Sequence, residues 1–156
     1  MSGSSQLVVF RVDEQRYGLA LAVVERIVRA VEVTSLPEAP AIVLGVIDVE
    51  GQVLPVLDLR RRLALPAREI DPASQFLIAR TPRRKVVLVI DEALDVFALP
   101  TTGMVGAAQI VPRLKHVKGV VALADGLVLI QDLDQFLSLD EERALDHALK
   151  KEPAHA

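Results

Sequence analysis

One strand–turn–strand unit that ends in a short helical stretch occurs twice in this chain, and this repeat limits the folds that the chain can adopt. Residues 45–65 read GVIDVEGQVLPVLDLRRRLAL, and residues 119–139 read GVVALADGLVLIQDLDQFLSL. The second copy has one extra turn residue before Gly126 and one residue fewer in the following strand. Chance similarity between two Val- and Leu-rich hairpins would not reproduce the same Asp-Leu ending at the same distance, so we interpret them as two copies of one β unit. The positions that match in register are Gly45/Gly119, Val46/Val120, Asp58/Asp132, Leu59/Leu133, Leu63/Leu137 and Leu65/Leu139.

The first copy carries local signals for a hairpin. Residues 46–49 are mostly β-branched and run into Glu50-Gly51, where a glycine can take the positive φ that a tight turn needs. The returning strand, residues 53–57, contains Pro55, which cannot donate a hydrogen bond to a neighbouring strand. We therefore expect Pro55 at a sheet edge or at a bulge, as in a small, strongly bent barrel.

The helical ending of the unit is expected to be capped and amphipathic. Asp58 is a candidate N-cap residue. Leu59 and Leu63 are four residues apart and are expected to face inward, while the three arginines at 60–62 mostly face water. A second basic stretch, at 80–85, is likewise interpreted as a solvated rim, because the chain as a whole is acidic.

The rest of the chain is predicted to consist mainly of short strands. Residues 22–28 combine helical spacing with β-branched residues, which predicts one or two helical turns, and residues 91–97 hold the equivalent place later in the chain. Residues 138–141, Ser-Leu-Asp-Glu, fit a capping box and predict a final helix at 140–150. The remaining expectations are disorder at 1–5, strands at 6–12, 16–21, 75–80 and 85–90, a proline-bounded loop at 36–40, a connection at 66–74, a long loop at 101–115 and a frayed end at 152–156.

The composition argues against several classes of protein. The 156 residues are 51% hydrophobic but only 3% aromatic, which predicts an aliphatic core in one domain or in two packed subdomains. A net charge of −3 and a pI near 5.6 argue against nucleic acid or an anionic membrane as the main partner. Cysteine is absent, which excludes disulfides and thiolate metal sites. No apolar run approaches the roughly 18 residues of a membrane span and no signal peptide pattern is present, so we expect a cytoplasmic protein.

Residues that could carry catalysis or hold a cofactor are scarce. The three histidines have no second ligand at metal-binding spacing, and no glycine-rich phosphate loop occurs. An enzymatic alternative is that Asp58 and Asp132 form a carboxylate dyad, but each precedes a leucine of a helical stripe, so helix capping is favoured. We predict no catalytic residue, no metal ligand and no cofactor, and a role in protein binding through strand edges and a groove between β subdomains.

Almost the whole chain resembles the CheW family of chemotaxis coupling proteins. The most specific part is residues 45–60, GVIDVEGQVLPVLDLR, where the family typically has G-V-I-N-L-R-G-x-x-L-P-V-x-D-L-R. Agreement in residue kind and spacing over this length is hard to obtain by chance. The other stretches that carry the resemblance are 7–12, 17–19, 24–27 and 36–40.

The resemblance implies an all-β fold, mainly β with short helices, made of two SH3-like five-stranded barrel subdomains and a C-terminal helix. We expect one CheW-like domain over residues 1–156, with subdomain 1 at about 16–70 and subdomain 2 at about 75–138. The strand at 6–12 is free to cross between the two, and the helix is expected at 139–151.

The resemblance also implies a non-enzymatic adaptor without a cofactor, which joins the cytoplasmic tip of a methyl-accepting chemoreceptor to the regulatory domain of a CheA-type histidine kinase. Such a protein would be a cytoplasmic monomer in isolation, recruited to membrane-associated receptor arrays, with no nucleic acid and no membrane insertion. A small β-barrel interaction module of another signalling pathway is the alternative. In the family, the receptor tip lies in an apolar groove between the subdomains, and the kinase pairs with the end of a subdomain. The residues that we assign to the receptor groove are Val24, Arg26, Ile27, Leu44, Gly45, Val46, Asp48, Val49, Glu50 and Gly51.

Two positions depart from the family pattern in opposite senses. Where the family usually has the arginine of Asn-Leu-Arg-Gly, this chain has Glu50, and where it usually has the acid of Val-x-Glu-Ile, this chain has Arg26. We therefore predict that Arg26 and Glu50 pair with reversed polarity, which would select a partner with matching altered charge.

Overall fold

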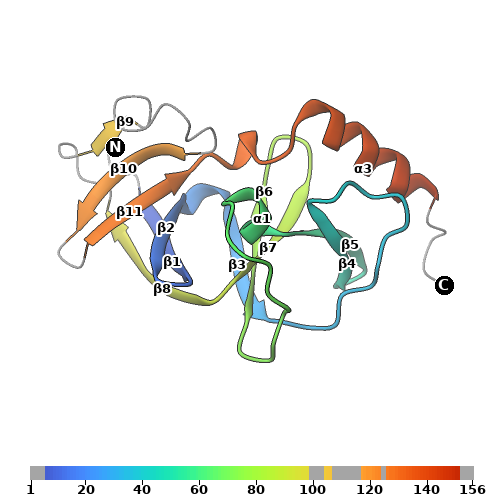
Figure 1. Ribbon diagram of the computed structural model, residues 1–156, viewed down its shortest axis with the longest axis horizontal. Helices are drawn as coiled ribbons and strands as arrows, with labels where there is room; N and C mark the ends of the chain where they lie inside the picture. The colour runs from blue at the N-terminus through green and yellow to red at the C-terminus, as the bar shows by residue number, and fades with distance from the viewer. Residues whose placement is uncertain (1–5, 99–103, 107–116, 124–125, 152–156) are drawn as a thin grey trace.

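The computed structural model describes residues 6–98, 104–106, 117–123 and 126–151 (Figure 1). Short strands account for most of this chain, and one longer helix ends it. The strands are β1 (Gln6–Val12), β2 (Gln15–Ala20), β3 (Val24–Arg29), β4 (Val43–Val49), β5 (Gln52–Leu57), β6 (Gln75–Arg80), β7 (Lys85–Ile90), β8 (Glu92–Ala98), β9 (Met104–Gly106), β10 (Val117–Leu123) and β11 (Gly126–Gln131). The helices are η1 (Leu21–Val23), α1 (Leu59–Arg62), η2 (Leu133–Gln135) and α3 (Leu139–Lys151).

The strands form two sheets that lie side by side (Figure 1). One has six strands in the order β8-β1-β2-β11-β10-β9, and the other has five in the order β3-β6-β7-β5-β4. The two orders correspond from one edge to the other: β8, β1, β2, β11 and β10 of the first sheet match β3, β6, β7, β5 and β4 of the second. Only the short β9 has no counterpart. The expectation of two five-stranded barrel subdomains with a C-terminal helix is therefore confirmed, and β9 adds a sixth strand to one of them.

The repeat seen in the sequence is also a repeat of structure. The β4–β5 pairing shifts register between Val43 and Gly45, and the β10–β11 pairing shifts between Val117 and Gly119, which is the same place in the unit. Each hairpin then pairs in parallel with a strand from the other half of the chain: β5 with β7, and β11 with β2. The sequence repeat therefore reports two equivalent hairpins, one in each sheet.

Each sheet takes strands from both halves of the chain, which corrects the expected division at about 16–70 and 75–138. Strands β6 and β7, between residues 75 and 90, complete the sheet that holds β3, β4 and β5. Strands β1 and β2, at the start of the chain, lie in the other sheet, together with β8, β10 and β11. The five-stranded sheet is therefore formed by the continuous stretch β3–β7, which is inserted between β2 and β8, so the chain crosses between the barrels twice.

Three apolar clusters explain why several strands read as continuous hydrophobic runs. One cluster fills the five-stranded barrel, a second fills the six-stranded barrel, and the largest lies between them. In β1, alternate residues serve different clusters: Val9 points into the six-stranded barrel, and Phe10 points into the shared core. Strands β6 and β7 divide in the same way between the five-stranded barrel and the shared core. A strand buried on both faces has no polar side, so hydrophobic alternation does not mark it.

The helix predicted at 22–28 is wrong beyond its first residues. Only Leu21–Val23 forms a helical turn, and Val24–Arg29 is the edge strand β3, paired with β6. The pairing shifts register at Glu25, which is a bulge, so Val24 and Ile27 both pack against the shared core although they are three residues apart. A bulged strand therefore produced the spacing that was interpreted as helical.

Pro55 lies on the interior strand β5, between β7 and β4, and it pairs in regular register, so the expectation of a sheet edge or a bulge is wrong. It faces Val46 of β4, and the parallel pairing of β5 with β7 begins one residue later, at Val56. Its missing N–H therefore falls just before the point where a second ladder starts.

The final helix begins at the predicted capping box. The Ser138 backbone N–H donates to Glu141 Oε1 at 2.9 Å, and the Glu141 N–H donates to Ser138 Oγ at 3.1 Å. Leu145 and Ala148 are buried in the shared core, so α3 packs on the body of the protein, beside the five-stranded sheet (Figure 1). The predictions for residues 1–5, for 152–156 and for most of 101–115 lie outside the described residues. Within the described chain, no helix is long and apolar enough to cross a membrane.

Candidate partner-binding surface

The β4–β5 turn has the geometry that the sequence predicts. Glu50 and Gly51 have φ values of 52° and 84°, and Val49 and Gln52 pair on either side of them, which defines a tight two-residue turn. The Gly51 N–H donates to Asp48 Oδ1 at 2.8 Å. The Asp48 side chain therefore fixes the turn, and it holds the Glu50 carboxylate out at the end of the barrel.

The predicted pair between Arg26 and Glu50 is present. Arg26 Nη2 lies 3.2 Å from Glu50 Oε1, and the two side chains are 45% and 79% exposed. Arg26 belongs to β3 and Glu50 to the β4–β5 turn, and β3 and β4 are the two outer strands of the five-stranded sheet. The pair therefore links the two outer strands at the place where this sheet closes into a barrel. Both side chains are accessible to solvent and to a partner.

A second group of charges surrounds this pair. Glu25 contacts Arg80 Nη2 at 2.6 Å and Lys85 Nζ at 3.2 Å, and Lys85 also donates to Gln52 Oε1 at 3.3 Å. The hydrogen bond from Arg80, with a further one from Lys85, lowers the pKa of the Glu25 carboxyl below its ordinary value. We call this end of the five-stranded barrel, residues 25, 26, 48–52, 80 and 85, the barrel-end surface. Because its charges balance one another locally, it is suited to recognition by charge pattern.

The structure divides the other predicted groove residues among different environments. Val24 and Ile27 are half-buried against the shared core, and Val46 is buried within it. Gly45 is buried where two backbones approach closely, since a Cβ there would lie 2.2 Å from the Thr34 carbonyl oxygen. Leu44 is the extra residue of the β4 bulge and is 39% exposed on another part of the barrel. The predicted residues therefore do not form one continuous groove, and Gly45 and Val46 shape the barrel from inside.

The two aspartates of the enzymatic alternative are helix caps. The Asp58 side chain accepts the Arg61 N–H at 3.2 Å, and the Asp132 side chain accepts the Asp134 N–H at 3.2 Å. Asp58 follows β5 and Asp132 follows β11, so the two follow strands of different sheets. The described residues contain no group of three or more His, Cys, Asp or Glu side chains that could hold a metal ion.

The expectation that the arginines at 60–62 mostly face water holds for Arg61. It is wrong for Arg62, whose side chain is 18% exposed and lies 2.7 Å from Glu141, and for Arg60, which is buried. Its guanidinium pairs with Asp13, lies 3.7 Å from Asp91 Oδ2 and donates to the Pro66 carbonyl at 3.1 Å. The Asp13 N–H also donates to Asp91 Oδ2 at 2.7 Å. Asp13 and Asp91 lie at the ends of β1 and β8 in the six-stranded sheet, whereas Arg60 follows β5 of the five-stranded sheet, so this group, which we call the seam cluster, joins both sheets. Its partners are distant in sequence, and only the spacing of acids at strand ends could have suggested it.

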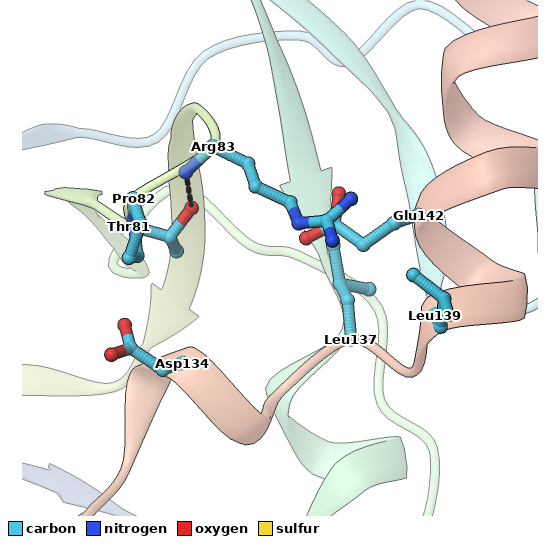
Figure 2. Close-up of a pocket in the computed structure, with 7 residues that line it drawn as sticks. All are labelled: Thr81, Pro82, Arg83, Asp134, Leu137, Leu139 and Glu142. Carbon is cyan, nitrogen blue, oxygen red and sulfur yellow. Dashed lines mark hydrogen bonds between the residues drawn. The ribbon is translucent and has the colours of Figure 1, made fainter.

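The basic stretch at 80–85, expected to be a solvated rim, also contains a structural arginine. Arg84 pairs with Glu142 through a 3.0 Å contact and with Asp146, which ties the β6–β7 turn to α3. Beside this contact is a hollow of about 200 Å³, lined by Thr81, Pro82, Arg83, Asp134, Leu137, Leu139 and Glu142 (Figure 2). In Figure 2 the Arg83 side chain reaches across from the turn toward the Glu142 side. The hollow has no nucleophile beside a base, so it offers no catalytic arrangement.

Comparison with known proteins agrees with this architecture. The family model described as "CheW-like domain" matches residues 6–141. Chemotaxis protein CheW of Rhizobium meliloti is 28% identical over 92% of this chain and 94% of its own length. Protein FrzA of Myxococcus xanthus is 32% identical over 72% of this chain and 71% of its own length.

A solved structure supports the fold independently. The crystal structure of the scaffolding protein TtCheW from Thermoanaerobacter tengcongensis aligns with a TM-score of 0.80 at 24% identity, covering 88% of this chain and 95% of that chain. The family match covers both barrels and the start of α3. This chain belongs to the CheW-like domain family.

Proposed function

We propose that this protein is a non-enzymatic adaptor of a bacterial chemosensory array, which couples the cytoplasmic tip of a methyl-accepting chemoreceptor to the regulatory domain of a CheA-type histidine kinase. The observation that carries this proposal is the CheW-like match over residues 6–141. Curated relatives named "Chemotaxis protein CheW" in Rhizobium meliloti and Bacillus subtilis support a role in chemotaxis signalling. The protein would act in the cytoplasm, at receptor arrays on the membrane.

The way in which the two barrels are joined supports a coupling role. An adaptor that transmits the state of one partner to another must hold two binding surfaces in a defined relation. Here the barrels are joined by two crossings of the chain, a shared core cluster and the ionic contacts of Arg60. A displacement imposed on one barrel would therefore be passed to the other rather than absorbed by a flexible linker.

The barrel-end surface supports a role in partner choice. Its Arg26–Glu50 pair is exposed and carries the reverse of the polarity that the family pattern typically has. Exposed pairs add only about 0–1 kcal/mol to stability, so the polarity of this pair matters more for the charge that a partner must present. We propose that the pair, with Val49 and the half-buried Val24 and Ile27, contacts a receptor or kinase with complementary charge.

Binding measurements with purified partners test the proposal. The full chain is titrated by calorimetry, at moderate salt, with the regulatory domain of the CheA-type kinase and with a receptor cytoplasmic fragment from the same cell. Saturable one-to-one binding is expected for each. If a folded protein binds neither partner, the adaptor proposal fails, and an interaction module of another pathway becomes the better explanation.

Two variants then test the role of the ion pair. Glu50→Arg places two cations side by side, and we expect it to weaken binding of one partner by about tenfold. Adding Arg26→Glu should restore part of the affinity. Glu14→Arg is a matched control, because Glu14 is exposed in the β1–β2 turn, away from the barrel-end surface. If the double variant recovers nothing that the single variants lose, the ion pair does not act as a unit in recognition.

A further inference from the structure

The five-stranded barrel carries a groove apart from the barrel-end surface. Two adjoining hollows, of about 470 and 390 Å³, share Val33 and Ile70 in their walls. They run between the segment at 30–33, which leaves β3, and the segment at 67–72, which leads to β6. The apolar residues that line this groove are Ala30, Val31, Val33, Leu44, Ala67, Ile70 and Pro72.

The groove has a supported floor and exposed apolar walls. Val33 and Ile70 are half-buried and pack against the core of the five-stranded barrel. Val31 is 52% exposed and Leu44 is 39% exposed. Leu44 points outward because it is the extra residue of the β4 bulge, so the local strand geometry places an apolar side chain in water. Exposed apolar residues above a firm floor are typical of a protein-binding groove.

The charges around the groove are acidic. Its lining contains the carboxylates of Glu32, Asp58, Glu69 and Asp71, but only one guanidinium, that of Arg68. Arg68 Nη2 lies 3.0 Å from Asp91 Oδ1, outside the groove, so its charge is already balanced.

The four acids differ in whether their carboxylates already have a partner within the protein. Asp58 and Asp71 accept backbone N–H groups at the start of α1 and in the turn before β6. Glu32 and Glu69 are exposed and have no ion-pair partner among the described residues. These two glutamates are the free charges of the groove.

We propose that this acidic groove binds a short segment of a partner protein that carries apolar side chains flanked by lysine or arginine. The apolar side chains would cover Val31, Leu44 and Ile70, and the cations would pair with Glu32 and Glu69. The same acidic rim repels nucleic acid phosphates and anionic lipids, and it would repel the acidic groove of a second copy. The proposal concerns a surface additional to the barrel-end surface and does not depend on receptor or kinase binding.

Peptide titrations followed by NMR test this proposal on the full chain. The probes are a short synthetic Leu/Lys peptide and a Leu/Glu peptide of the same length and pattern. We expect saturable shifts of the amides at 31–33, 44 and 67–70 with the Leu/Lys peptide only. Glu32→Lys/Glu69→Lys should weaken binding by about tenfold, and Leu44→Ser should weaken it by severalfold.

Matched controls separate the groove from non-specific attraction. Glu14→Lys/Asp134→Lys changes the net charge equally but alters exposed acids outside the groove, and Leu127→Ser removes a leucine that is 56% exposed elsewhere. Both should bind as the wild type does. The proposal is overturned by equal binding of the two peptides, by shifts that map elsewhere, or by no binding at all. Concentration-dependent self-association that Leu44→Ser abolishes would also overturn it, by identifying a second copy as the occupant.

Discussion

Two clusters of ion pairs use the same residue types for different purposes. In the seam cluster, the Arg60 side chain is 10% exposed and holds Asp13 and Asp91 from different turns. At the barrel end, Arg26 and Glu50 are 45% and 79% exposed. A buried pair is costly to break because a charge is left without water or partner, whereas an exposed pair loses little when it is broken. The comparison indicates that the first cluster holds the two barrels together and that the second is available to a partner.

The largest expected effect is that of removing the buried guanidinium. Arg60→Ala removes the buried cation of the cluster and leaves Asp13 and Asp91 with the more exposed Arg68 and Arg11, so we expect a loss of about 2 kcal/mol in the free energy of unfolding. Urea denaturation followed by circular dichroism measures this. Arg61→Ala is the control, because Arg61 is the exposed neighbour in the same helix and should change stability by less than about 0.5 kcal/mol. Equal effects of the two substitutions would contradict the assignment of Arg60 as the link between barrels.

The pH dependence of stability provides a second way to examine the seam. The hydrogen bond from Arg60 lowers the pKa of the Asp13 carboxyl below its ordinary 3.8. Because the folded state binds this proton less readily than the unfolded state, the stabilisation is fully present above pH 3.8 and is lost as the pH falls through the lower folded pKa. Asp13→Asn should therefore be less stable at neutral pH and should lose less stability than the wild type on acidification. Unfolding curves measured at several pH values check this, and parallel curves for the two proteins would contradict it.

The contrast between the clusters also shows what the sequence could predict. The β4–β5 turn, the Asp58 cap and the α3 capping box depend on neighbouring residues, and the structure confirms each of them. The Arg26–Glu50 pair was predicted from two departures from a family pattern, and it is present too. Interactions between residues that are close in sequence can thus be inferred from one chain. So can a pair of residues that both depart from a family pattern.

What escaped prediction depends on residues that are distant in sequence. The bulge at Glu25 places Val24 and Ile27 on the same face, and it can be recognised only when the partner strand β6 is known. The placement of β6 and β7 depends on which strand pairs best, because β1, β6 and β7 are apolar on both faces and carry no pattern that selects a partner. Asp13 and Asp91 come together where β1 pairs with β8, and the burial of Arg60 requires the other sheet as well, because Arg60 follows β5.

At the barrel end, the turn itself should matter more for stability than the charges beside it. Gly51 has a φ of 84° and open space around the position of a Cβ, so Gly51→Ala meets no clash and costs only the strain of a left-handed residue, about 1 kcal/mol. The thermal unfolding midpoint should fall by a few degrees. Gly45→Ala, where a Cβ would lie 2.2 Å from the Thr34 carbonyl oxygen, should cost more. If the order is reversed, the close approach at Gly45 is not rigid.

The smallest effect on stability is expected for exchange of the exposed pair. Arg26→Glu/Glu50→Arg keeps both charges and their 3.2 Å contact while restoring the polarity typical of the family, so the free energy of unfolding should change by less than about 0.5 kcal/mol. Partner affinity should stay below that of the wild type, although above that of Glu50→Arg alone, because the pair is restored but the partner then meets the opposite charge pattern. Calorimetric titration with the kinase regulatory domain, beside urea denaturation of the same sample, separates the two effects. The opposite result would be a variant that is destabilised by more than about 1 kcal/mol and yet binds as the wild type does. It would contradict the assignment of this pair to recognition, because the exposed pair would then maintain the fold.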